Sequence, residues 1–332
     1  MLQGDSPMVA VKEFQDFHNK LTEGLVIFGT GSLVFDTEKK PIINAKYLKN
    51  TENVFRTINR KGLNLKQKCL CNLKYFIWPK VNQFIQQPRL SQTIINTKIG
   101  VVNSIYFLGY WQYPFQTTKR ADLSIDHSSQ ESRTPTFMKA TGEMAYEQNT
   151  KLNALMVSVP FNKSDYSMLI IISRKISRIE EIEEQLKDID LLKVARDKKK
   201  NFELVMPGFE FNFEMELNEF LFNEMSITGI FENWRDFSNL SNKKLFVQSI
   251  NHKTRIAVTP TKMEVASVNV VQFDESPKGA AKSSEFEQEY WLVRSRNNGA
   301  EEVKLDKPFY FAVRNKEKVF FVGTIKDFKN II

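Results

Sequence analysis

The chain has 332 residues, of which 42% are hydrophobic and 26% are charged, a composition typical of a soluble globular protein with a large core. The formal net charge is +8, from 47 Lys and Arg against 39 Asp and Glu, and this mild excess does not indicate a nucleic-acid partner. No apolar run approaches the roughly 18 residues of a membrane span. The first residues lack the apolar core of a signal peptide.

Basic residues and cysteines give weak signals for a binding site. Lys198–Lys200, with Arg196 beside them, form the densest basic run. A solvated face is the simpler interpretation of this run, and a polyanion site is the alternative. Cys69 and Cys71 are too few for a disulfide framework, and C-x-C alone is not a zinc signature. We expect free thiols, no metal and no cofactor.

Hydrophobic periodicity predicts helices and strands in succession along the chain. Gly29 and Gly31 indicate a turn between two strands, and no third glycine follows to complete a nucleotide-binding fingerprint. The many adjacent strands predict an α+β (mixed α/β) fold with a large sheet. Helices are expected at 9–25, 66–85, 176–189 and 217–225, and strands at 25–35, 94–107, 152–161, 166–173, 202–213, 246–258, 308–313 and 319–325.

The longest stretch without a regular pattern extends from Lys262 to Phe309. Loops of this length are uncommon in compact domains, and they are usually functional or disordered. This stretch contains Arg294, Ser295 and Arg296, and an exposed Arg-Ser bond is a substrate for a trypsin-like protease. Solvated loop charges are the alternative interpretation of the two arginines.

The sequence lacks the patterns of enzyme active sites. His18, His127 and His252 form no H-E-x-x-H pair, and neither a G-x-S-x-G elbow nor a P-loop occurs. His252 follows an apolar strand and is interpreted as a structural histidine. We therefore do not expect an enzyme.

A series of short motifs resembles, in order, the serpin family of serine protease inhibitors. Asn103 begins NSIYFLGYWQYPF, which is similar to the family's Asn-Ala-Ile-Tyr-Phe strand with its later Gly-x-Trp and Pro-Phe. The order of the motifs over residues 94–325 carries the resemblance more than any single motif does. The later motifs are Tyr166–Ile172, His252-Lys253, Lys307-Pro308-Phe309 and Phe321-x-Gly323-x-Ile325.

The resemblance implies one serpin-like domain over residues 1–332, with a large central sheet, smaller sheets and surrounding helices. It also implies a reactive-centre-type loop at 259–304. The family's first helices have no evident counterpart, so we expect an N-terminally shortened, divergent member. A monomer in an extracellular, secreted setting follows from the resemblance, although this chain shows no signal peptide. Asn162 and Asn239 begin N-glycosylation triplets.

The expected mechanism depends on the hinge of that loop. In the family a protease cuts the loop, which then enters the main sheet as an extra strand and traps the protease. Entry favours small, uncharged hinge residues. Two alignments remain open, from His252 and from Arg294. The first places Lys262, Met263 and Val265 in the hinge, and the second places Lys282, Glu285 and Phe286 there.

Neither alignment supplies a hinge of small residues, so we expect a weak or non-inhibitory protein. It would serve as a binding or regulatory module, or as a module that proteases cleave. The alternative is an active suicide inhibitor of a trypsin-like serine protease, cut at Arg294-Ser295. Two structural expectations accompany this interpretation. Residues 269–303 should be exposed and poorly ordered, and Asn103 and His252 should lie together in a polar cluster where the sheet opens.

Overall fold

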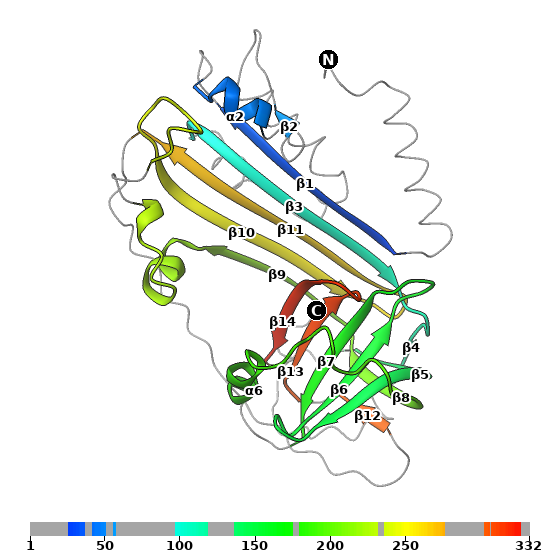
Figure 1. Cartoon of the computed structure of the whole chain (residues 1–332). Helices are drawn as coiled ribbons and strands as arrows, with labels where there is room; N and C mark the ends of the chain where they lie inside the picture. Colours follow the sequence, from blue (N-terminus) through cyan, green and yellow to red (C-terminus); the bar gives the residue numbers. More distant parts are fainter. Residues whose placement is uncertain are drawn as a thin grey trace, which may run out of the picture.

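A computed structural model places more than half of the described residues in two β-sheets (Figure 1). Among the described residues, the helical segments are short. They are α2 (Ala45–Asn50), α6 (Ile179–Leu186), η2 (Phe220–Glu224) and η3 (Gly229–Phe231). The described residues are 26–36, 42–50, 56–57, 97–118, 136–174, 179–231, 236–275, 302–305 and 307–326.

The first sheet has six strands in the order β2-β1-β3-β11-β10-β9. Every neighbouring pair is antiparallel except β1 with β2. The strands expected at 94–107 and 246–258 are confirmed as members of this one sheet. Its strands are β1 (Ile27–Asp36), β2 (Arg56–Thr57), β3 (Ile99–Tyr110), β9 (Phe209–Glu216), β10 (Phe246–Val258) and β11 (Lys262–Asp274).

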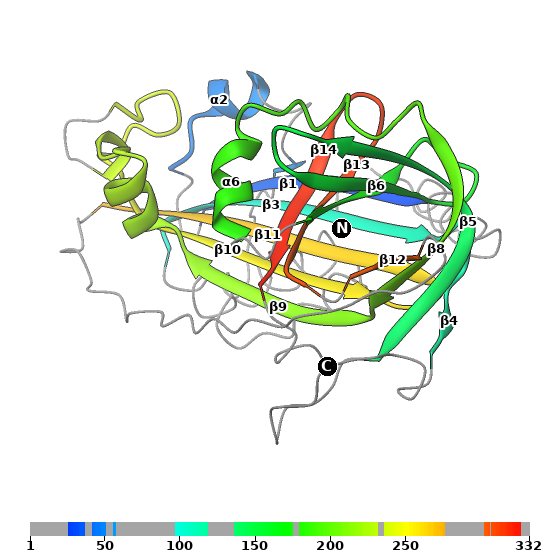
Figure 2. The ribbon, with the colours of Figure 1, turned by 90° about the horizontal axis from the view of Figure 1, so that it is seen from below.

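The second sheet has eight strands, in the order β12-β8-β5-β6-β7-β13-β14 with β4 paired to β5. The expected hairpin across 162–165 is confirmed as β6 and β7. Figure 2 shows β13 and β14 crossing the direction of the six-stranded sheet. The strands are β4 (Gln116–Thr117), β5 (Phe137–Asn149), β6 (Ala154–Pro160), β7 (Ser167–Ser173), β8 (Lys199–Pro207), β12 (Glu302–Lys304), β13 (Phe309–Arg314) and β14 (Val319–Ile325).

The main hydrophobic core lies where the two sheets meet. Phe107 of β3 packs edge-on against Phe161, with ring centroids 5.1 Å apart. Gly109 permits this approach, because a Cβ there would lie 2.6 Å from the Phe161 ring. A second cluster lies between α6 and the other face of β6, β7 and β13. The packing of aromatic rings therefore fixes one end of the six-stranded sheet against the second sheet.

Several expected elements differ in detail. β1 continues through Gly29 and Gly31 without a turn, because its ten residues pair in unbroken register with β3. The strand expected at 202–213 is interrupted at Gly208, which separates β8 from β9. The helix expected at 176–189 is confirmed as the shorter α6. The helices expected at 9–25 and 66–85 lie outside the described residues.

The largest difference concerns the segment after Lys262. The expectation of an irregular loop is wrong for 262–274, and the expectation of an exposed segment is wrong for 269–274, because these residues form β11. β11 pairs with β10 on one side and with β3 on the other over nearly its whole length. Its backbone donors and acceptors are thereby satisfied within the sheet. Residues 276–301 lie outside the described residues.

Candidate functional site

A three-residue turn, 259–261, joins β10 to β11 at the start of the candidate site. The Thr259 hydroxyl donates to the Lys262 carbonyl at 3.0 Å. The Trp111 indole donates to the Thr259 carbonyl at 2.9 Å, and the Phe115 backbone N–H donates to the Pro260 carbonyl at 2.8 Å. These contacts hold the turn against the segment that follows β3.

The apolar side chains of β11 are part of the core. Met263 and Val265 have no exposed surface and belong to the core between the two sheets. At the other end of the strand, Phe273 packs edge-on against Phe237, with ring centroids 5.3 Å apart. Ala266, Val268 and Val270 are buried on the opposite face. Both faces of β11 are therefore covered, as expected for a central strand.

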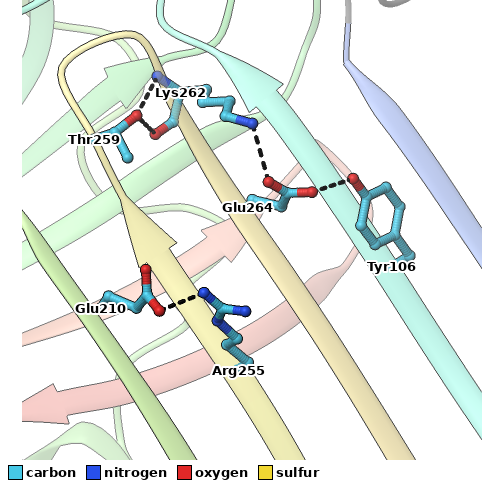
Figure 3. A network of polar contacts seen from close by, with 6 residues as sticks. All are labelled: Tyr106, Glu210, Arg255, Thr259, Lys262 and Glu264. Carbon is cyan, nitrogen blue, oxygen red and sulfur yellow. Dashed lines mark hydrogen bonds and ion pairs between the residues drawn. The ribbon is translucent and has the colours of Figure 1, made fainter. Parts of the chain in front are cut away.

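Charged residues at the start of β11 are paired (Figure 3). The Lys262 ammonium lies 3.0 Å from one oxygen of the buried Glu264 carboxylate. The Tyr106 hydroxyl donates to the other oxygen at 2.5 Å. On the neighbouring strands, Arg255 donates to Glu210. The cost expected for burying an unpaired lysine or glutamate in the sheet is therefore not incurred here.

The Tyr106 hydroxyl is also the group most affected by burial at this site. Burial and the hydrogen bond to Glu264 raise the pKa of Tyr106 well above its ordinary value of 10.0. Because the pKa of Tyr106 is higher in the folded protein than in the unfolded chain, the phenol contributes its full stabilisation at pH values below the unfolded pKa. That stabilisation is lost as the pH rises above the unfolded pKa and through the folded pKa. The phenol therefore stays neutral and keeps donating to Glu264.

We predict that Tyr106→Phe lowers the free energy of unfolding by about 1–3 kcal/mol at neutral pH, because the buried Glu264 loses a donor. Above about pH 10 the wild type should lose stability more steeply than the variant. Urea unfolding from pH 7 to 11 measures both effects. Tyr113→Phe, which removes only an exposed hydrogen bond with Gln112, serves as the control. Parallel alkaline slopes in wild type and Tyr106→Phe would contradict the prediction.

A row of polar side chains crosses the middle of the sheet. His252 of β10 lies opposite Asn269 of β11, which lies opposite Asn103 of β3. The His252 Nδ1 and Asn269 Oδ1 atoms are 2.6 Å apart. Thr254 lies 2.9 Å from His252 Nε2, and its hydroxyl donates to Ser267 at 2.9 Å. Asn269 thus lies between Asn103 and His252, the two residues expected to lie together. Their role where the sheet opens stays a prediction.

Arg314 is a candidate residue that the sequence analysis missed. It is fully buried at the end of β13 and donates to the carbonyls of Val194 at 2.7 Å and Ala195 at 3.2 Å. It also donates to the carbonyl of Leu191. Burial and the nearby Arg196 lower its pKa to about 10. In the sequence, the only sign of a special role for Arg314 is its position at the end of an apolar strand.

The remaining sequence signals are weaker. Lys199 and Lys200 lie on β8, and strand alternation directs neighbouring side chains to opposite faces. The basic run therefore does not form one continuous patch. Across the described residues there is no cluster of three metal-ligating side chains, and no helix there has the length and apolarity to span a bilayer. Cys69 and Cys71 lie outside those residues.

The family model described as Serpin (serine protease inhibitor) matches residues 10–328. The chain belongs to the serpin family. The expected serpin-like fold is thereby confirmed. The proposed reactive bond of this serpin, Arg294-Ser295, and the second candidate, Arg296, lie outside the described residues, so both stay predictions.

Curated proteins from several organisms are similar to this chain. An uncharacterized serpin-like protein of Methanosarcina mazei is 26% identical, over 82% of this chain and 66% of that protein. Antitrypsin of Bombyx mori is 25% identical, over 68% and 54%. Intracellular coagulation inhibitor 2 of Tachypleus tridentatus is 24% identical, over 87% and 65%. The chain thus spans between about half and two thirds of the length of these relatives.

Solved serpin structures share the fold. Cleaved Serpin 42Da has a TM-score of 0.67 at 17% identity, over 98% of this chain and 81% of that chain. The thermophilic serpin Tengpin in the latent state has a TM-score of 0.63 at 16% identity, over 97% and 86%. At these identities the similarity shows the fold alone.

The two glycosylation candidates differ in their surroundings. Asn239 is exposed, in a turn that the Asn44 side chain contacts through a hydrogen bond to the Ser238 carbonyl. Asn162 is half-buried, and its backbone N–H donates to the Tyr110 carbonyl at 2.8 Å. Modification of either residue stays a prediction.

Proposed function

We propose that this serpin is a weak or non-inhibitory member of its family. It serves as a binding or regulatory module, and a trypsin-like protease cuts it at Arg294-Ser295 or after Arg296 without being trapped. An extracellular setting belongs to the same proposal, and Asn239 is the more accessible glycosylation candidate there.

The observation that carries the proposal is the occupied position between β3 and β10. Trapping by loop insertion requires that a strand enter the sheet after cleavage. In this chain β11 already fills that position and pairs on both sides. Cleavage downstream of β11 would then release little further free energy, and an acyl-enzyme would have time to hydrolyse.

The segment that follows β11 is long enough for β11 to lie in the sheet while the chain is uncut. Glu275 and Glu302 are separated by 27 residue steps (302 − 275), which reach about 90 Å at full extension. The 13 residues of β11 rise only about 40 Å. The chain can therefore pass along the whole of β11 and return to β12 uncut.

The side chains of β11 also fit the position. The hinge that begins at Lys262 departs from small residues, yet Met263 and Val265 lie in the core and Lys262 pairs with Glu264. Related folds include a serpin described as cleaved and one described as latent. These points favour β11 as a strand of the sheet in the uncut protein, rather than as an exposed loop segment that enters the sheet only after cleavage.

The test is incubation of the intact chain with trypsin, followed by a denaturing gel and a melting curve. We expect first cuts after Arg294 and Arg296, no stable high-mass complex, and a change in Tm below about 3 °C, which corresponds to about 1 kcal/mol in a large domain. The Arg294→Ala, Arg296→Ala double variant, which should resist the first cuts, is the control.

Two outcomes would overturn the proposal. A covalent complex that survives denaturation would establish the active inhibitor cut at Arg294-Ser295. A rise in Tm of tens of degrees after nicking would show that a strand enters the sheet only on cleavage.

A further inference from the structure

A cavity of about 720 Å³ lies at the turn end of the β6–β7 hairpin. Its walls come from the hairpin, the segment between α6 and β8, the residues that follow β3, and from β5, β8 and the turn between β13 and β14. The volume is in the range of pockets that hold small organic molecules. Its lining includes Tyr113, Tyr166, Lys193, Arg196, Lys199 and Lys316.

The cavity wall carries charges of both signs. Four cationic side chains line it, against the three carboxylates of Glu143, Asp165 and Asp197. Two of the four cations are engaged: Lys193 pairs with Asp190 at 3.1 Å, and Arg196 donates to backbone carbonyls. The ammonium groups of Lys199 and Lys316 make no hydrogen bond or ion pair with any described residue, so they are available to a ligand.

A further positive charge lies directly behind the wall. Arg314 donates to Ser158 at 3.4 Å and to the Ala195 carbonyl at 3.2 Å, and both of these residues line the cavity. Its partners are neutral oxygens, and no carboxylate of the described chain lies within ion-pair distance. Its Nε atom is buried without a partner. Glu147 and Asp190 offset only part of the burial of its charge, and an anion in the cavity would reduce the remaining cost.

The cavity also has an aromatic side. The Tyr166 ring stacks on Phe320, with centroids 5.5 Å apart, which holds it in place. Burial raises the pKa of Tyr166, so its hydroxyl stays neutral and can donate a hydrogen bond. Tyr113 contributes a second ring to the lining. A ligand that fits this wall has an apolar body as well as a charge.

We propose that this cavity binds a small aromatic carboxylate, with its carboxylate held by Lys199 and Lys316 and its ring against Tyr113 and Tyr166. Lys199 and Lys316 are the two lining cations without a partner among the described residues, and one carboxylate can accept from both. A long polyanion fits less well, because it needs a continuous stripe of cations. Here the cations line a concave space and carboxylates lie among them.

The test is calorimetric titration of the intact protein with 2-naphthoate and with its neutral analogue, 2-naphthamide. We expect saturable binding of the carboxylate and binding of the amide that is at least about tenfold weaker, because a charge-assisted hydrogen bond is lost. Lys199→Gln combined with Lys316→Gln should weaken naphthoate binding by at least about tenfold.

The matched control is Lys198→Gln combined with Lys318→Gln. These two exposed lysines adjoin the cavity in sequence but do not line it, and the control removes the same total charge. It should leave naphthoate binding unchanged. Equal binding of naphthoate and naphthamide would overturn the proposal. The proposal would also be overturned if dextran sulfate bound and both double variants weakened that binding equally, because this result would indicate a diffuse basic surface. All four lysines are exposed, so unchanged melting curves will exclude a loss of fold.

Discussion

Val265→Asp, introduced into the uncut protein, is expected to lower the free energy of unfolding by more than about 4 kcal/mol. Val265 has no exposed surface in the core between the two sheets, so the carboxylate would be buried without a partner. Urea unfolding measures the change, with mass spectrometry to show that the chain is intact. In an exposed loop the same substitution would have almost no effect.

Val322→Asp provides the matched control for this prediction. Val322 lies on β14 and is 53% exposed, so its substitution should change stability by less than about 1 kcal/mol. If Val265→Asp proved as mild as this control, β11 would lie outside the sheet in the uncut protein. The proposed non-inhibitory function would then lose its main support.

Arg314→Ala is expected to lower the free energy of unfolding by about 3–5 kcal/mol. The substitution leaves the carbonyls of Val194 and Ala195 without their donor and opens a cavity beneath the segment that covers β6 and β7. Arg314→Lys keeps the charge but lacks the planar fork that contacts several oxygens at once, so an intermediate loss is expected.

The comparison for this second prediction is Arg174→Ala. Arg174 is exposed and donates to Gln148 at 3.3 Å, so its loss should cost less than about 1 kcal/mol. Thermal and urea unfolding of the three variants should therefore rank them in the order Arg314→Ala, Arg314→Lys, Arg174→Ala. Equal stability of the two alanine variants would show that Arg314 does not hold the 191–195 segment in place.

Strands with dense apolar residues could be predicted from the sequence alone. β7 is buried at every position, and a short apolar run rich in isoleucine and bounded by turn residues favours a buried strand. β11 was missed for a specific reason. Its β-branched residues between Met263 and Phe273 favour a strand, but the long stretch from Lys262 to Phe309 shows little regular pattern as a whole, and the family resemblance implies a loop at the same place. The structure follows the local signal.

The candidate site was only partly predictable. Lys262 and Glu264 are two residues apart, so on a strand they share a face and their pairing could have been inferred. The donor from Tyr106 could not, because it comes from 158 residues earlier in the chain. Its contact depends on the register of β3 against β11, which no local pattern reports. The cavity near Lys199 and Lys316 likewise joins distant segments.

The short turn at 259–261 has a consequence for folding kinetics. Val258 and Met263 are paired neighbours, so β10 and β11 form a hairpin with little loop-closure entropy, and hairpins form in about 1–10 μs. Pairing of Lys262 with Tyr110 joins residues 152 positions apart (262 − 110) and is correspondingly slow. The pairing of β10 with β11 is therefore expected to form well before β11 pairs with β3.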